Sequence, residues 1–143
     1  MAIDTHLTGG CFCGAVRFRL EASPLKIGVC HCQACKKLTG GTSWSFALVL
    51  ADALHVSGEV REVTRMSESG YPVHVGFCPA CGTTLASRSD HWAQFRTLSV
   101  GAFDETEGLT TSFHIWTKSA YPWEIMPEGA RCFERHLPEK APS

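Results

Sequence analysis

The chain has 143 residues, of which 44% are hydrophobic and 19% charged, and its formal net charge is −1 at pH 7. This balance is typical of a folded globular protein and excludes disorder along the whole chain. The Lys36–Lys37 pair is too short to form the basic face of a nucleic-acid-binding protein. No segment approaches the roughly 18 apolar residues that span a bilayer. We therefore expect a single domain over residues 1–143, without a nucleic-acid or membrane partner.

The N-terminus lacks the basic region and the apolar region of a secretory signal peptide. We therefore expect a cytoplasmic protein. Thiols stay reduced in that compartment, so the eight cysteines would be available for metal rather than for disulfide bonds.

The predicted elements begin with a strand over residues 16–21, where apolar and charged residues alternate strictly. Residues 27–29 are expected to be extended and to lead into three cysteines at positions 30, 32 and 35. After Cys35, the glycines at positions 40 and 41 predict a single helical turn over residues 36–41.

Short strands separated by turns are predicted for the rest of the chain. The candidates cover residues 44–50, 54–56, 60–63, 73–77, 85–88, 97–100 and 113–116. Prolines prevent a long helix in residues 117–138, which we expect to wrap over the core. Because no segment keeps a 3.6-residue period, about ten short strands predict a mainly β fold.

The three clustered cysteines, Cys30, Cys32 and Cys35, predict a metal site. Three thiols within six residues are poorly placed for disulfide bonds, whose Cα atoms lie roughly 4.4–6.8 Å apart with matched Cβ directions. Thiolates select zinc over hard cations, and the Cys-x-x-Cys spacing directs two sulfurs at one ion.

Two further pairs, Cys11/Cys13 and Cys78/Cys81, are followed by Gly14 and Gly82, and we expect both pairs to have the same turn geometry. Seven thiols divide naturally into four and three. Four thiolates make a closed, structural zinc site, which we assign to these two pairs, whereas three ligands leave a position open for water or substrate. The sequence thus predicts two zinc ions per chain.

Alternatives remain for the trio of Cys30, Cys32 and Cys35. All seven thiols could be structural ligands, or the trio could be closed by His31, another histidine or Cys132. A zinc with three thiolates and an open position is a weak Lewis acid, but it is suited to holding an added thiol as thiolate. His31 is a candidate acid or base, because imidazole titrates near neutrality.

The remaining candidate residues have simpler expected roles. Lys36 and Lys37 are either solvated or attract an anionic substrate. Cys132 is expected to be a packed free thiol. Half-buried strand positions are expected for His74 and His114, and surface positions for His6, His55, His91 and His136.

The cysteine motifs follow one another in a specific order. They are Gly-Gly-Cys-x-Cys-Gly at residues 9–14, Cys-His-Cys-x-x-Cys-Lys-Lys at 30–37 and Phe-Cys-x-x-Cys-Gly-Thr at 77–83. A His-Ile-Trp sequence at 114–116 and a Pro-Trp pair at 122–123 come later. In this order, over about residues 9–138, the chain resembles the glutathione-dependent formaldehyde-activating enzyme family, which also includes centromere protein V.

The resemblance implies a β-rich fold similar to that of Mss4, with two zinc ions. It implies a structural zinc held by Cys11, Cys13, Cys78 and Cys81, and a catalytic zinc held by Cys30, Cys32 and Cys35. The activity that names the family joins formaldehyde to glutathione as S-hydroxymethylglutathione, and the reverse reaction is that of a carbon–sulfur lyase.

We therefore expect a zinc-dependent, carbon–sulfur lyase-like enzyme. Its substrate would be an adduct of a small thiol, such as glutathione, with a small aldehyde, such as formaldehyde. The alternative is a non-catalytic zinc-binding module that recruits a protein partner.

Overall fold

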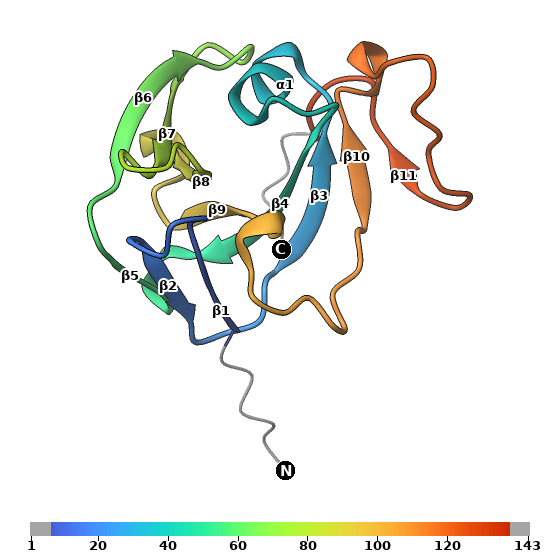
Figure 1. Cartoon of the computed structure of the whole chain (residues 1–143). Helices are drawn as coiled ribbons and strands as arrows, with labels where there is room; N and C mark the ends of the chain where they lie inside the picture. Colours follow the sequence, from blue (N-terminus) through green and yellow to red (C-terminus); the bar gives the residue numbers. More distant parts are fainter. Residues whose placement is uncertain (1–6, 138–143) are drawn as a thin grey trace.

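The computed structural model describes residues 7–137, which form mainly short β-strands (Figure 1). Within these residues, the α-helix α1 (Gln33–Thr39) and four 3-10 turns, at Ala51–Ala53, Asp90–Trp92, Val100–Ala102 and Thr117–Ser119, connect the strands. None of the helices described is long and apolar enough to cross a membrane. The expected mainly β class is confirmed. The strands are β1 (Leu7–Gly10), β2 (Arg17–Leu20), β3 (Lys26–Cys30), β4 (Trp44–Leu50), β5 (Leu54–Ser57), β6 (Arg61–Met66), β7 (Pro72–Phe77), β8 (Thr84–Arg88), β9 (Phe95–Ser99), β10 (Phe113–Ile115) and β11 (Arg131–Cys132).

The strands form two sheets. The smaller sheet has the order β1-β2-β5, and the larger has the order β11-β10-β3-β4-β9-β8-β7-β6. In the larger sheet β10 runs parallel to β3 and β11, whereas the other neighbouring strands are antiparallel. The larger sheet curves strongly, so that the β6–β7 hairpin at one edge approaches α1, which follows β3 (Figure 1).

The main core lies between the two sheets. The alternation of β2 buries Phe18 and Leu20 and exposes Arg17 and Arg19, as the period-two pattern of this segment predicts. Phe18 and Leu20 pack against one face of the larger sheet. The cluster consists of Phe18, Leu20, Ile27, Ala47, Val49, Leu98 and Phe103.

The opposite face of the larger sheet leads to the cysteine trio. Cys30 is paired with Trp44 of β4, and Gly28 lies between Phe46 of β4 and Phe113 of β10. The ring of Phe113 covers Gly28 and packs edge-on against Phe46, with ring centroids 5.8 Å apart. Gly28 therefore leaves room for the Phe113 ring, which packs in the hydrophobic cluster that contains the trio.

Three elements differ from the sequence-based expectation. The helix begins at Gln33 rather than after Cys35, because the Cys32 Sγ accepts a hydrogen bond from the Cys35 N–H and caps α1. Its end is as predicted, since Gly40 adopts a left-handed conformation. Strand β1, which includes Gly9 and Gly10, and strand β11 were not predicted.

Replacement of Gly28 by alanine tests the packing under Phe113. A Cβ at this position would overlap the Phe113 ring, so the ring or the backbone must move. We expect Gly28→Ala to lower the free energy of unfolding by about 1–3 kcal/mol in urea denaturation. The control is Gly101→Ala, whose added Cβ would meet no atom within 4 Å. Equal stability of the two variants would contradict this account.

Candidate metal centres and the adjoining cleft

The first candidate centre joins two turns that are remote in the sequence. Cys11 and Cys13 follow β1, and Cys78 and Cys81 follow β7. Their four Sγ atoms lie within 4.8 Å of one another. Gly14 and Gly82 both have a φ of 81°, but the Gly14 N–H donates to the Cys11 carbonyl oxygen three residues back, whereas the Gly82 N–H donates to the Cys78 carbonyl oxygen four residues back. The two turns therefore differ in length by one residue, and the expectation of the same turn geometry is wrong.

The sulfur spacing of this cluster fits a zinc ion. Sulfurs around a tetrahedral zinc, with Zn–S bonds of about 2.3 Å, lie roughly 3.8 Å apart. The Cys13 Sγ lies 3.6 Å from the Cys11 Sγ and 3.8 Å from the Cys78 Sγ. A hydrogen bond with the Thr83 hydroxyl lowers the pKa of Cys81 to about 5, which favours the thiolate. The cluster thus has the donors and the spacing of a closed, four-thiolate site.

The second candidate centre is the trio of Cys30, Cys32 and Cys35, all of them buried. Cys30 ends β3, Cys32 caps α1, and Cys35 lies in the first turn of that helix. Their Sγ atoms lie within 4.8 Å of one another. The strand end and the capped helix therefore bring the three predicted ligands together.

The three thiols cannot all ionise without a neutralising cation. Hydrogen bonds from Cys30 and Cys35 lower the pKa of Cys32 to about 2, so Cys32 is the thiolate of the group. The hydrogen bond to Cys32 raises the pKa of Cys30 to about 12, and contacts with Cys30 and Cys32 also raise the pKa of Cys35. A divalent cation would remove this competition by accepting all three sulfurs.

No fourth ligand joins the trio within residues 7–137. None of their other His, Cys, Asp or Glu side chains places a donor atom in the group. Cys132 is exposed on β11, where its Sγ lies 3.6 Å from the Ala130 carbonyl oxygen, so the expectation of a packed thiol is wrong. A three-thiolate site with one open position is the arrangement that these residues can form.

His31 points to another histidine rather than joining the trio. It is 2% exposed, and its Nε2 lies 3.0 Å from the Nδ1 of His114, which is also buried. Burial lowers the pKa of both imidazoles, and their proximity lowers that of His31 further. The Nδ1 of His31 is buried and has no hydrogen-bond partner. His31, which lies between Cys30 and Cys32 in the sequence, thus has one buried ring nitrogen without a partner.

The two lysines after the trio have different environments. Lys37 is exposed, but Lys36 is buried, and its Nζ donates a hydrogen bond of 2.7 Å to the Ser119 carbonyl oxygen. The same Nζ lies 3.9 Å from the centre of the Tyr121 ring. Lys36 therefore fastens the C-terminal segment to α1, a role that neither sequence-based alternative included.

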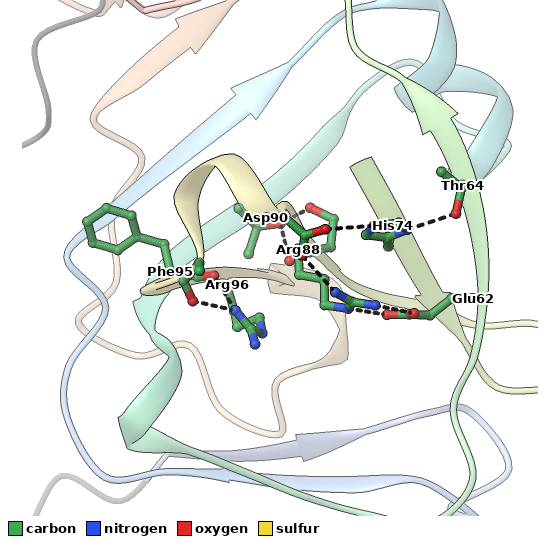
Figure 2. A network of polar contacts seen from close by, with 10 residues as sticks. Glu62, Thr64, His74, Arg88, Asp90, Phe95 and Arg96 are labelled. Carbon is green, nitrogen blue, oxygen red and sulfur yellow. Dashed lines mark hydrogen bonds and ion pairs between the residues drawn. The ribbon is translucent and has the colours of Figure 1, made fainter. Parts of the chain in front are cut away.

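The other histidines of the described residues contribute no donor atom to either centre. His74 is half-buried on β7, as expected, with its Nδ1 2.8 Å from the Thr64 hydroxyl and its Nε2 3.9 Å from Asp90 (Figure 2). His114 is buried rather than half-buried. Surface positions are confirmed for His55, His91 and His136, and His6 lies outside the described residues.

A cleft of about 740 Å³ lies next to the hydrophobic cluster that contains the trio. Phe113 and Ile115 line the cleft and also pack in the hydrophobic cluster that contains the trio. Its walls include four basic side chains and no Asp or Glu of the described residues; the basic ones are Lys26, Arg88, Arg96 and Arg131. Aromatic rings come from Tyr71, Trp92, Phe95 and Phe113.

A smaller gap lies directly beside the trio. It encloses about 10 Å³, and Cys35, Trp44, Arg65 and Ser87 are among the residues that line it. That volume holds about one water molecule at most. Because Ser87 also lines the large cleft, the gap and the cleft share a wall.

Sequence reasoning missed Arg65 and the cleft. Arg65 and Arg61 both lie on strand β6, and no spacing in the sequence distinguishes the two. The aromatic residues Tyr71, Trp92 and Phe95 come from the ends of different elements, and where they meet depends on the curvature of the sheet. No local pattern could have predicted either feature.

The chain matches a known protein family over most of its length. Residues 6–119 match the family model described as "Glutathione-dependent formaldehyde-activating enzyme". The chain belongs to this family. A Halomonas elongata protein named "Putative glutathione-dependent formaldehyde-activating enzyme" is 30% identical over 96 residues, which are 62% of this chain and 59% of that protein. The chain thus matches about three fifths of the length of this curated relative.

The fold of this family member also occurs in a solved structure. The crystal structure of a Rhodobacter sphaeroides protein superposes on this chain with a TM-score of 0.53. The superposition covers 88% of this chain and 98% of the Rhodobacter chain. Its sequence identity is 18%, so the similarity establishes the fold alone.

A double-mutant cycle tests the pairing of His31 with His114. Replacing either residue with leucine leaves the other buried imidazole without its partner, and we expect each single variant to lose about 1–3 kcal/mol of unfolding free energy. Replacing both removes the unsatisfied group, so the double variant should lose less than the sum of the two single losses. Urea denaturation measures all four proteins, and additive losses would contradict the pairing.

Proposed function

We propose that the chain is a zinc-dependent, carbon–sulfur lyase-like enzyme of the S-hydroxymethylglutathione synthase type. Its substrate would be an adduct of a small, glutathione-like thiol with a small, formaldehyde-like aldehyde. Cys11, Cys13, Cys78 and Cys81 would hold a structural zinc, and the trio would hold a catalytic zinc. The observation that supports this most is that three buried thiols converge, without a fourth ligand from residues 7–137, beside a large cleft.

The proposed reaction balances without any further reagent. In the forward direction the thiol sulfur forms a bond to the aldehyde carbon, the C=O π bond breaks, and the thiol proton ends on the new hydroxyl group. A zinc bound by the trio would supply an open position that stabilises a substrate sulfur as thiolate. In the reverse direction the C–S bond breaks and the proton returns to sulfur.

The protein's own residues would orient the reactants and move the proton. Phe113, Ile115 and Trp44 enclose the trio and exclude water from it, and the cleft would bind the rest of the thiol. We assign His31 as the acid or base, because its Nδ1 is buried, unpartnered and one residue from two of the ligands. His114 would hold the His31 ring in place through the Nε2 contact.

The domain and compartment assignments belong to the same proposal. The two sheets share one core, which supports a single domain over residues 1–143. All eight cysteines are free thiols, and a reducing compartment such as the cytoplasm would keep them so.

A non-catalytic module that recruits a protein partner is the second candidate. The observation that favours it is a pair of exposed apolar side chains in the C-terminal segment, Trp123 at 67% and Ile125 at 89% exposure. They lie beyond Tyr121, on which Trp123 stacks. This candidate gives no role to the open position of the trio or to the cleft.

The two proposed zinc sites predict different responses to mutation. We expect two zinc ions per chain by elemental analysis of protein purified without added metal. Cys78→Ser should destabilise the fold strongly, because the first site joins β1 to β7, whereas Cys35→Ser should keep one zinc and melt closer to the wild type. A content of one zinc or less in the wild type, or equal losses of melting temperature, would contradict the assignment.

Turnover tests the reaction itself. Thiols add to formaldehyde unaided, so the enzyme contributes by presenting the sulfur and orienting the carbonyl. NMR exchange spectroscopy with labelled formaldehyde and glutathione should show exchange faster than in buffer, and the gain should vanish in Cys35→Ser and in metal-depleted protein. If the rate with protein equals the buffer rate for glutathione and other cellular thiols, the recruiting module becomes the better proposal.

A further inference from the structure

Arg65 is a charged side chain that the structure leaves without a partner. Within residues 7–137 its guanidinium group has no hydrogen bond or ion pair, and its Nε is buried. Burying an unpaired charged donor costs free energy, so such a group usually has a functional partner. In these residues the only other buried side-chain nitrogen or oxygen atom without a partner is the Nδ1 of His31, beside the trio.

The guanidinium group of Arg88, in contrast, has a partner within the chain. Arg88 makes two hydrogen bonds to the Glu62 carboxylate, of 2.8 and 2.9 Å, within the network on the other face of β6 (Figure 2). Strand alternation directs Glu62 and Thr64 to that network and Arg65 to the opposite face. Arg65 therefore faces the trio instead of a carboxylate of its own chain.

The position of Arg65 places a positive charge next to the ligand thiols. The β6–β7 hairpin curves toward α1 (Figure 1), and Arg65 lines the small gap together with Cys35 and Ser87. Lys36, the cation nearest to the trio in the sequence, is already held by Ser119 and Tyr121.

The surroundings of Arg65 favour an anionic ligand. The gap shares Ser87 with the cleft, whose wall includes Lys26 and Arg131 and no Asp or Glu of the described residues. A carboxylate a few bonds from a sulfur at the trio would lie within reach of a guanidinium group that borders Cys35, and guanidinium binds carboxylate with two parallel hydrogen bonds.

We propose that Arg65 is a specificity-determining residue that binds the carboxylate of a small thiol whose sulfur is at the trio. This inference rests on the proposed function, since it takes the trio as the site of the substrate sulfur. It adds the substrate class, a thiol that carries a carboxylate close to its sulfur, and the residue that recognises it.

A comparison of two small thiols tests the proposal. 3-Mercaptopropionate and 2-mercaptoethanol present similar thiol groups but differ in carrying a carboxylate or a hydroxyl. Their dissociation constants follow from titration of the cobalt-substituted full-length protein, monitored by the sulfur-to-cobalt absorption band. We expect the wild type to prefer the carboxylate by about tenfold or more, the range of a charge-assisted hydrogen bond.

Three variants make the test specific. Arg65→Gln should bring the preference close to one while leaving the affinity for 2-mercaptoethanol within about threefold. Arg65→Lys should keep part of the preference, because it keeps the charge but loses the paired geometry. Arg61→Gln is the matched control on the same strand and face, since Arg61 is exposed and borders neither the gap nor the cleft, and it should behave as the wild type.

The outcomes separate this proposal from the proposed function. If Arg65→Gln keeps the preference, or weakens both thiols equally, Arg65 only balances the charge of the trio and the proposal is wrong, although turnover can still support the lyase. If the preference depends on Arg65 but turnover equals the buffer rate, Arg65 recognises a bound thiol and the lyase assignment is wrong. Absence of an absorption band with either thiol would overturn both.

Discussion

The structure depends on bringing seven thiols from three segments together at two points. The first point connects the turn after β1 with the turn after β7, and so ties the small sheet to the large one. The second closes the end of β3 against α1. Closely spaced thiolates repel one another, so both arrangements require protons or a cation to neutralise them. The fold thus provides two positions at which a cation would neutralise clustered thiolates.

Sequence patterns predicted the features whose causes are local. The alternation in β2, the glycines that end α1 and shape the two cysteine turns, and the grouping of the cysteines each depend on a few consecutive residues. The start of α1 was missed because its cap is a cysteine sulfur, which is not among the usual capping groups. β1 was missed because glycines are depleted in strands, and it forms here through pairing with β2. The cleft was beyond prediction, since its walls come from segments that only the curvature of the sheet brings together.

Strand β6 shows how an edge strand can serve two purposes. Its even-numbered residues, Glu62 and Thr64, contribute to the polar network of Figure 2, which contains Arg88, His74 and Asp90 and secures the outer hairpin. Its odd-numbered Arg65 projects to the face that holds the trio. Exposed ion pairs of this kind stabilise a fold little, so the value of the network lies in positioning the hairpin rather than in its energy.

The distribution of satisfied polar groups around the trio limits what can bind there. Lys36 and His114 are buried near it, and each has a partner within the chain, so neither is available to a ligand without breaking a contact. The two buried atoms of the described residues that lack partners are the Nδ1 of His31 and the Nε of Arg65. One is suited to exchanging a proton and the other to holding an anion. A ligand that satisfies both, and that also places a sulfur at the trio, needs a thiol, an exchangeable proton and a negative charge within a short distance of one another. An adduct of an aldehyde with a carboxylate-bearing thiol has all three, whereas an uncharged thiol would leave the buried Nε of Arg65 without a partner.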